Sequence, residues 1–538
     1  MKSQKQILGE NSVILILSTI IVKIIGAVFK IPLASDKFLG DIGFGYFSVA
    51  HDLFMPFYVL AISGLPVAIS HLTAQNLAKK HYSAVKNDFY KAKKLFLVLG
   101  VCFSLLVCAL SVPIVTASVS GKNSLYSIIA VVPSIFLCFI ISVYRGYFEG
   151  FNNMYPTAVS KIIEALFKLI LGLLFAFLVI KKTSNPALAA AAAMAAVSVG
   201  TLISTLYLHL KFKHNNPLTN LSVGKSEGGA SLTFKTLLIL AIPFALSSLA
   251  SSLVGLIDVF TVKLQIANAN DNYFSFLANQ NINGDISAYL YGIRSKAFTL
   301  FNLVPTITMS LGVGALPVLT HINTADNQSN LNNNISYTLK LITTVTMPAG
   351  IGLAVLSHRI MNLLYVANNA LEGNILAIYG IAAIFAGVAV PLTNVLQSIG
   401  LHYKALKHIV FALLIKVISN TLLALIPAFN IYSVAFGTLL CYLYLFISFL
   451  YIIKKEIKAL SVKNTIFKPL LPAALCGISA FLFALISSSS IITLLAILIA
   501  VIVYFASIII LKTFSKDEIL ALPLLNKFAN NKNTTISK

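Results

Sequence analysis

The chain alternates long apolar stretches with short polar ones. About fourteen of the apolar stretches are roughly 20 residues long, the length with which an α-helix crosses a bilayer. Strands of a membrane β-barrel instead alternate apolar and polar residues over about 10 residues. Runs such as 95–115 and 491–511 are continuously apolar. The pattern therefore predicts an all-α polytopic membrane protein.

Polar residues interrupt the apolar runs and set the limits of the predicted spans. These are 11–33, 46–72, 95–115, 125–144, 159–180, 187–208, 237–262, 286–311, 339–356, 375–399, 405–426, 431–453, 470–486 and 491–511. Loops 79–94, 211–235 and 454–468 are basic, whereas 265–285 has no Lys or Arg. Because basic loops stay in the cytoplasm, both termini are expected there. Two loops depart from this rule: 181–182 is basic but predicted outside, and 321–334 lacks Lys and Arg but is predicted inside.

Two segments outside the central spans have their own signals. Residues 1–10 lead into the first span without a small-residue cleavage site, so we expect a retained helix rather than a removed signal peptide. Segment 79–94 carries Val85, Phe89 and Tyr90 among its lysines. It fits either an amphipathic helix on the anionic inner leaflet or a solvated basic loop.

A weak internal repeat divides the spans into two halves. Gly-Asp-Ile occurs at 40–42 and again at 284–286, and the stretches 149–168 and 397–416 have equal length and end on a lysine inside a span. Ordered matches of this kind indicate two six-helix lobes with pseudo-two-fold symmetry. The predicted lobes are 1–215 (helices 1–6) and 216–455 (helices 7–12), followed by two further helices and a cytoplasmic tail in 456–538.

Composition agrees with the span pattern. Of 538 residues, 58% are hydrophobic and only 10% are charged, which excludes a soluble globular protein. The net charge of +23 lies mostly in loops between spans, so it reflects membrane topology and predicts no nucleic-acid partner. The five cysteines lie in apolar spans without metal-ligand spacing.

The sequence lacks the motifs of an enzyme or an ATP-driven pump. It has no Walker loop, no paired carboxylates and no histidine cluster for a metal. We therefore expect no catalytic residue, no metal site and no cofactor. A secondary transporter remains, driven by a proton gradient, a sodium gradient or the membrane potential.

Lysines inside the spans are the most unusual feature, since one at bilayer depth costs ~2.5 kcal/mol or more unless it faces protein or water. Lys23 and Lys30, seven residues apart, share one helix face, and Lys30 also suits a snorkelling side chain that reaches the interface. Glu164 and Lys168 have the i, i+4 spacing of an ion pair, which suits a structural pair or a ligand site. Lys416 has no acid within a turn, so it needs an acid on another helix, a carbonyl, water or a bound anion.

Further charges occur near the predicted outer ends of the spans. Asp258 can pair with Arg294 or Lys296, as an outer gate or a cargo clamp. Asp52 beside His51 offers another pair or a proton-sensitive element. Basic residues in the spans outnumber acidic ones, which favours a phosphate or pyrophosphate cargo.

Several short strings follow one another in an order typical of a known family. They are Lys23-Ile-Ile-Gly26, Lys30-Ile-Pro32-Leu33, 63–70 (Ser-Gly-Leu-Pro-Val-Ala-Ile-Ser), Arg145-Gly146 with Glu149-Gly150, 154–158 (Met-Tyr-Pro-Thr-Ala), Glu164 with Lys168, and 256–262 (Leu-Ile-Asp-Val-Phe-Thr-Val). Together they resemble the stage V sporulation protein B and lipid II flippase branch of the multidrug/oligosaccharidyl-lipid/polysaccharide exporter superfamily. The resemblance covers nearly the whole chain.

The resemblance implies a cationic cavity between two lobes, with a groove for a polyprenyl tail on the last two helices. It implies that an undecaprenyl-pyrophosphate-linked sugar is flipped across the bacterial cytoplasmic membrane by alternating access. By position, it carries pyrophosphate binding over to Lys23, Arg145, Lys168 and Arg294. One departure, Phe29-Lys30 where peptidoglycan flippases often have an arginine, favours the sporulation-type branch.

The candidate residues from both arguments form two sets. Substrate binding is predicted for Lys23, Lys30, Arg145, Lys168, Arg294 and Lys416, and support or gating for Asp52, Glu149, Glu164, Asp258 and Lys296. The leading hypothesis is a flippase for the peptidoglycan precursor lipid II. Its expected partners are that lipid-linked substrate, anionic membrane lipids and proteins of cell-wall synthesis.

Four alternatives stay open at this point. One is a flippase of the same kind whose cargo is an O-antigen, capsule or teichuronic unit. A cation-coupled drug exporter would call for an acidic cavity, and a membrane enzyme would need convergent carboxylates or histidines. An envelope-assembly scaffold would transport nothing.

Overall fold

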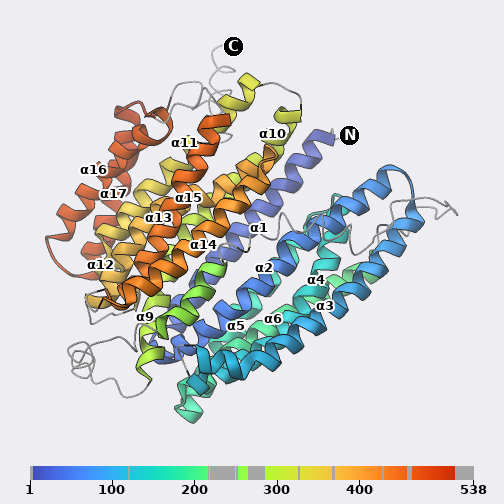
Figure 1. The fold of residues 1–538 in the computed structure, drawn as a ribbon, viewed down its shortest axis with the longest axis horizontal. Helices are drawn as coiled ribbons and strands as arrows, with labels where there is room; N and C mark the ends of the chain where they lie inside the picture. Colours follow the sequence, from blue (N-terminus) through green and yellow to red (C-terminus); the bar gives the residue numbers. More distant parts are fainter. Residues whose placement is uncertain are drawn as a thin grey trace, which may run out of the picture. The chain divides into compact units, whose positions relative to one another are not determined.

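The structure is a computed structural model of the 538-residue chain. It describes residues 4–118, 121–215, 252–263, 285–324, 328–365, 370–426, 429–456 and 463–514, with isolated positions 217 and 249. Within these ranges the secondary structure is helical, without strands (Figure 1). Eleven helices among the described residues are long and apolar enough to cross a membrane. The predicted all-α polytopic architecture is confirmed.

Most predicted spans coincide with a helix that extends beyond them at one or both ends. The helices of the first half are α1 (Gln4–Leu33), α2 (Gly40–Ala78), α3 (Tyr82–Ala117), α4 (Leu125–Gly150), α5 (Tyr155–Thr183) and α6 (Pro186–His214), with a 3-10 turn at Gly121–Ser124. Of the predicted span 237–262, only 252–262 and the isolated position 249 lie within the described residues, and 252–263 is helical.

The helices of the second half also coincide with predicted spans, with two exceptions. They are α9 (Ile286–Phe301), α10 (Leu303–Thr324), α11 (Gln328–Val355), α12 (Ser357–Tyr365), α13 (Ala370–Ser398), α14 (His402–Ala424), α15 (Tyr432–Glu456), a π-helical turn at Lys463–Phe467, α16 (Lys468–Ala484) and α17 (Ser490–Ile510). The short helix α12 was not predicted, and the single span predicted at 286–311 is wrong because Asn302 separates α9 from α10. Pro305 explains the break, since it lacks an N–H and its ring crowds the carbonyl of Phe301.

Segment 79–94 differs from both sequence interpretations. Most of it forms the first turns of α3, and Val85 and Phe89 are buried. The Phe89 ring stacks on Phe212 of α6 with 4.4 Å between centroids. The apolar side of this segment therefore packs on protein, so the segment is neither a separate helix lying on the membrane nor a solvated loop.

The chain divides into two compact units. Unit 1 is Met1–Leu303, Leu364–Val366 and Leu401–Leu445, and unit 2 is Val304–Leu363, Ala367–Gly400 and Phe446–Lys538. The division of the sequence into lobes at 215 and 455 stays a prediction.

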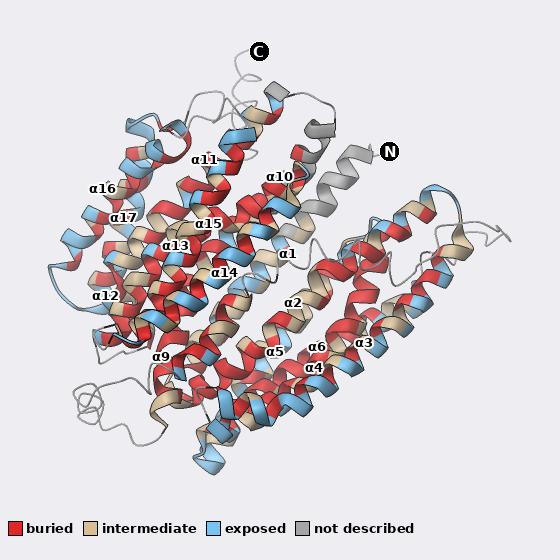
Figure 2. Cartoon of the chain, viewed as in Figure 1, coloured by how far each residue is buried: buried red, intermediate tan, exposed pale blue. Residues whose placement is uncertain are grey.

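Within unit 1, α4 and α6 are inner helices and α3 and α5 are outer ones. The most apolar window is 61% buried in α6 and in the segment ending with α4, but only 22% in α3 and 17% in α5 (Figure 2). Small residues allow close helix contacts: Gly146 of α4 lies against the backbone of Pro66, and Gly200 of α6 against that of Glu164. Away from their basic ends, the exposed sides of α3 and α5 are apolar, as expected for helix surfaces in contact with lipid.

Unit 2 is built around α11. Its Thr343 donates a hydrogen bond to the carbonyl of Thr465 (2.6 Å), and Tyr504 of α17 donates to the carbonyl of Thr344. On α16, Ala473 and Ala480 are fully buried in the same core. These contacts join the last two membrane helices to α11.

Candidate functional site

Accessible side chains on α1 form two separate faces. One is an apolar stripe, each member 43–57% exposed, made of Leu17, Ile21, Ile24 and Val28. The other carries Lys23, which is exposed, and Lys30, which is half-buried. At about 100° per residue, the two lysines lie roughly 120° or more from the centre of the apolar stripe. They share a face, as predicted, and that face is not the lipid-facing one.

Helix α5 repeats this arrangement. Lys161, Glu164 and Lys168 share a half-buried face, while the exposed apolar residues Ile170 and Phe177 lie on the opposite side. Sequence analysis did not identify Lys161. Its signal was available, because Lys161 and Lys168 have the same seven-residue spacing as Lys23 and Lys30.

The two lysine-bearing helices pack together. The Phe29 ring of α1 lies against Gly172 of α5, where no side chain intervenes, and Lys168 Nζ lies 5.9 Å from the centroid of the Phe29 ring. The charges of Lys23 and Lys30 both interact electrostatically with that of Lys168. We call Lys23, Lys30, Lys161 and Lys168 the lysine face. None of the four forms an ion pair with another described residue.

Glu164 and Lys168 interact electrostatically, but they do not form the direct ion pair that their spacing allowed. Glu164 instead accepts a hydrogen bond from Nη2 of buried Arg145 on α4, at 2.9 Å. Arg145 Nε also donates to Ser160 Oγ at 3.0 Å, while its Nη1 has no hydrogen-bond partner among the described residues. Glu149, one turn from Arg145 and half-buried, lies within electrostatic range of Lys161. Lys168 is therefore left without a carboxylate partner of its own.

A second set of charges is deeply buried and balanced. Asp258, fully buried on helix 252–263, accepts hydrogen bonds from Arg294 of α9 and from Lys416 and Asn420 of α14. Asp52 of α2 contacts the same arginine, with 3.2 Å between Asp52 Oδ2 and Arg294 Nη1. We call Asp52, Asp258, Arg294 and Lys416 the buried ion network. Two carboxylates offset two cations, so the network is close to neutral.

The surroundings of Lys416 in the structure differ most from those expected from the sequence. It has no acid nearby in sequence, yet its Nζ lies 2.6 Å from Asp258 Oδ1. Nζ also donates to Thr438 Oγ1 at 2.8 Å and to the carbonyl of Val434 at 3.3 Å. The side chain is completely buried. Of the partners that the sequence allowed, the structure has both the acid on another helix and a backbone carbonyl.

Arg294 pairs with Asp258 as predicted, and its guanidinium also lies 4.0 Å from the centroid of the Phe298 ring. Asp52 accepts a further hydrogen bond from Tyr291 Oη at 2.7 Å and interacts electrostatically with Lys30. Asp52 is thus the member of the buried ion network that also interacts with the lysine face.

Lys296 does not take part in the buried ion network. It is buried and pairs with Asp41 at the start of α2, while its Nζ lies 5.3 Å from the centroid of the Tyr365 ring. Close backbone contacts join α2 to α9 here, because Gly45 lies against the carbonyl of Ala288 and Gly292 against that of Asp41.

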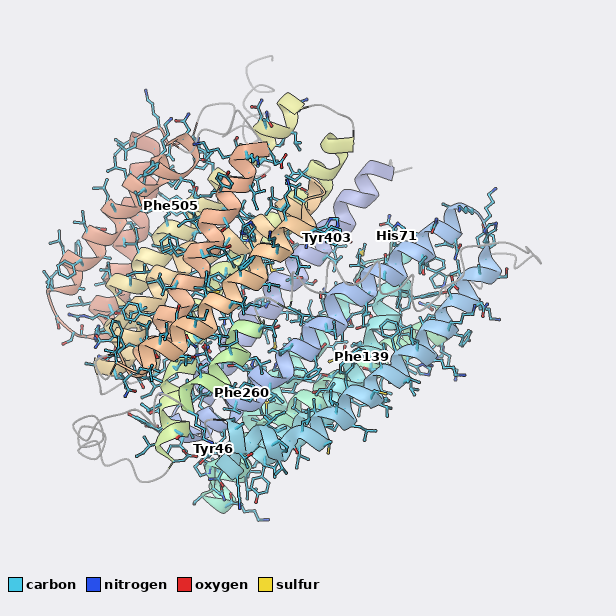
Figure 3. The ribbon with its side chains drawn as sticks, viewed as in Figure 1. Tyr46, His71, Phe139, Phe260, Tyr403 and Phe505 are labelled. Atoms are coloured by element: carbon cyan, nitrogen blue, oxygen red, sulfur yellow. The ribbon has the colours of Figure 1, made fainter. Side chains whose placement is uncertain are left out.

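The hydroxyl of Tyr46 forms hydrogen bonds at the same end of α2. Tyr46, labelled in Figure 3, accepts a hydrogen bond from Asn123 Nδ2 at 3.0 Å. Its hydroxyl donates to Asp285 Oδ2 at 3.4 Å. The start of α2 is thus tied to the start of α9 by charge, by hydrogen bonds and by glycine packing.

The structure therefore separates the predicted substrate-binding residues into two classes. Lys23, Lys30 and Lys168 are accessible and lack a carboxylate partner within the described residues, whereas Arg294 and Lys416 are buried and paired. Arg145 is buried and paired, but its Nη1 has no hydrogen-bond partner in the part of the chain that the structure describes. Among the described residues there is no group of three potential metal ligands. An accessible row of ammonium groups is suited to binding an anion of more than one charge.

Comparisons with known proteins agree with this picture. Residues 8–323 match the family described as polysaccharide biosynthesis protein. Stage V sporulation protein B of Bacillus subtilis (strain 168) is 25% identical over 80% of both chains, and lipid II flippase MurJ of the same organism is 26% identical over 81% of both. A solved structure of lipid II flippase MurJ in an inward closed conformation superposes with a TM-score of 0.64, at 16% identity, over 92% of this chain and 98% of its own.

These findings confirm the resemblance seen in the sequence strings. The helical fold and the relatives class the chain as a multi-pass membrane transporter rather than an enzyme. Since the family match covers more than half of the 538 residues, the chain belongs to the polysaccharide biosynthesis protein family.

Proposed function

We propose that the chain is a flippase that moves an undecaprenyl-pyrophosphate-linked sugar across the bacterial cytoplasmic membrane, with lipid II as its cargo. The observation that carries this proposal is the lysine face on α1 and α5. Four ammonium groups lie on two packed helices, away from the lipid-facing stripes, with the charge of Glu164 already engaged by Arg145.

The chemistry of a pyrophosphate group fits such a surface. It presents several charged oxygens within a few ångströms, and charge-assisted hydrogen bonds to them are about twice as strong as neutral ones. Lysine supplies rotatable donors on a flexible stem, so the contacts can change partners as the head group moves along a helix. The seven-residue spacing on each helix separates its two ammonium groups by two turns, about 10 Å.

The positive charge of the lysine face argues against the export of cationic drugs. A cationic drug would be repelled by Lys23, Lys30, Lys161 and Lys168. Of the carboxylates near them, Glu164 is engaged by Arg145 and Asp52 by Arg294, and Glu149 interacts electrostatically with Lys161. A cation exporter would need accessible acids where the lysine face lies.

A second cargo class has its own support. The family description names polysaccharide biosynthesis, and one relative is a sporulation protein. Both are compatible with another lipid-linked sugar, such as a unit of a capsule or teichuronic polymer. The lysine face would contact the pyrophosphate that these cargoes share, so the sugar has to be distinguished by experiment.

The direct test is transport by the purified full-length chain in proteoliposomes. Fluorescently labelled lipid II is expected to cross the bilayer faster than in protein-free vesicles, and undecaprenyl-pyrophosphate-linked units with other sugars are expected to compete poorly. Equal transport of all lipid-linked sugars would point to the second cargo class, and no transport of any would refute the flippase. Rescue of cells depleted of their lipid II flippase is the corresponding test in vivo.

The energy source and the orientation are part of the same proposal. We propose that both termini lie in the cytoplasm, as the basic loops indicate. A proton gradient, a sodium gradient or the membrane potential is the proposed driving force. Imposing each gradient separately on the proteoliposomes identifies which one raises the rate.

A further inference from the structure

Glu164 lies between two cations of the lysine face along α5. It follows Lys161 by three residues and precedes Lys168 by four, so all three side chains share one side of the helix. Its charge interacts electrostatically with both lysines. The spacing alone would let Glu164 neutralise either of them. In the structure, its direct ion pair is instead with Arg145 of α4.

Arg145 is held against α5 by two hydrogen bonds. Its Nη2 donates to Glu164 Oε2 at 2.9 Å, and its Nε donates to Ser160 Oγ at 3.0 Å. Ser160 lies one turn before Glu164, so the guanidinium bridges two consecutive turns of one helix. Ser160 Oγ donates its own proton to the carbonyl of Thr157 at 2.7 Å, which orients its oxygen to accept from Arg145. The arginine is therefore placed to hold Glu164 in one position.

The backbone around this pair is closely packed. A Cβ at Gly200 of α6 would lie 3.0 Å from the carbonyl oxygen of Glu164. A Cβ at Gly146, next to the arginine on α4, would lie 2.7 Å from the carbonyl oxygen of Pro66 on α2. Tyr58 of α2 also interacts electrostatically with Glu164. Three neighbouring helices thus fix the pair of Arg145 and Glu164.

Arg145 offers no accessible donor to a ligand, in contrast to the lysine face. The residue is only 1% exposed, and its Nε and Nη2 are engaged. Its remaining nitrogen, Nη1, is buried and has no hydrogen-bond partner within the described ranges. Glu164 is the more accessible member of the pair, with 12% of its side chain exposed against 2% for Arg145. From the accessible side, the guanidinium is covered.

We propose that Arg145 is a positioning residue, which keeps Glu164 from pairing with Lys161 or Lys168 and so leaves both lysines available to the pyrophosphate of the cargo. This inference rests on the proposed function, and it replaces the direct pyrophosphate contact that the family resemblance implies for Arg145. Without the guanidinium, Glu164 would pair with one of the two ammonium groups, because a partly buried charge without a partner is costly.

Equilibrium binding of undecaprenyl pyrophosphate to the purified full-length protein in detergent tests the proposal. Undecaprenol is the second probe, because it has the same tail and lacks the pyrophosphate. The ratio of the two affinities therefore measures the contribution of the head group. Arg145→Met should lower this ratio about ten-fold, since Glu164 takes one charge-assisted contact away from the pyrophosphate. The affinity for undecaprenol should not change, which shows that the variant is folded.

A double variant distinguishes positioning from direct contact. Arg145→Met/Glu164→Gln removes one charge of each sign and leaves all four ammonium groups of the lysine face available. We expect its affinity ratio to return to within about three-fold of that of the parent protein. The matched control Arg145→Met/Ser160→Ala keeps the charge of Glu164, so its ratio should stay as low as that of Arg145→Met.

A double variant Arg145→Met/Glu164→Gln as weak as Arg145→Met would overturn the proposal, because it would show that the guanidinium itself contacts the pyrophosphate. An Arg145→Met ratio equal to that of the parent would also overturn it. The double variant decides the question even where Arg145→Met does not fold, since its ratio has to match that of the parent. A parent protein that binds both lipids equally would refute the pyrophosphate site of the proposed function, and this inference with it.

Discussion

At the scale of single residues, burial and pairing distinguish two kinds of cation in this transporter. The buried ion network holds Arg294 and Lys416 against Asp52 and Asp258, with distances of 3.2 Å for Asp52–Arg294 and 2.6 Å for Asp258–Lys416. A buried charge without a partner costs several kcal/mol, so these four groups stabilise one another. The lysine face has no such partners among the described residues, which leaves its charges available to a ligand.

Removing the central carboxylate should destabilise the protein. Asp258→Asn leaves Lys416 buried without an anion, at a cost of about 3–5 kcal/mol in the free energy of unfolding. The double variant Asp258→Asn/Lys416→Met removes one charge of each sign and should recover a large part of that loss. Thermal unfolding of the purified proteins in detergent measures both. An Asp258→Asn variant as stable as the parent, or a double variant less stable than both single variants, would contradict the assigned network.

These residues were identifiable from the sequence, but only some of their partners were. It predicted the pair of Asp258 with Arg294 and the shared face of Lys23 and Lys30, because adjacent spans and helical periodicity are local information. It did not predict the contact of Lys416 with Asp258, whose positions are 158 residues apart. Such a pair depends on how helices pack, and the apolar pattern along one helix does not encode which neighbour it meets.

At the scale of helices, close packing at glycine distinguishes the contact of α2 with α9. A side chain at Gly45 would collide with the backbone carbonyl of Ala288, and one at Gly292 with that of Asp41. Small residues at such crossings let the two backbones approach closely. The resulting van der Waals contact holds the helices together, because the hydrophobic effect between helices is weak in lipid. The charged pair Lys296–Asp41 then lies directly beside a backbone contact.

A methyl group should be enough to disturb this crossing. Gly45→Ala adds a Cβ that overlaps the backbone of α9, so we expect a lower melting temperature than that of the parent protein. Gly26→Ala is the matched control, since nothing lies within 4 Å of a Cβ at that position of α1. Its better helix propensity should leave stability unchanged or raise it by up to about 1 kcal/mol. Equal melting temperatures for the two variants would show that the contact of α2 with α9 is not close-packed.

Most helix positions were predictable from the sequence, because each of these helices has its own apolar run. The break at Asn302 was missed because the apolar pattern continues through it, although Pro305 three residues later was a local signal. A helix was one of the two sequence interpretations of 79–94, but its continuity with α3 and the packing of its apolar face on α4 and α6 were not predicted, because they depend on neighbouring helices.

At the scale of the whole molecule, a helical membrane fold carries an accessible cationic face that suits an anionic cargo. The fold rests on eleven described membrane-length helices and on the family match over residues 8–323. Cargo binding rests on the lysine face alone, because the other predicted cations have partners. The central claim is therefore that accessible lysines on α1 and α5, and not the buried ion network, bind the pyrophosphate.

The most direct test is the initial rate at which proteoliposomes flip labelled lipid II when the lysine charges are removed. Two lost charge-assisted hydrogen bonds, at about 1.5 kcal/mol or more each, predict that Lys23→Gln/Lys168→Gln lowers the rate about 100-fold or more. Lys23→Arg/Lys168→Arg should stay within several-fold of the parent, and Lys122→Gln/Lys182→Gln, outside the site, should match it. A Lys23→Gln/Lys168→Gln protein that flips lipid II at the parent rate would contradict the account.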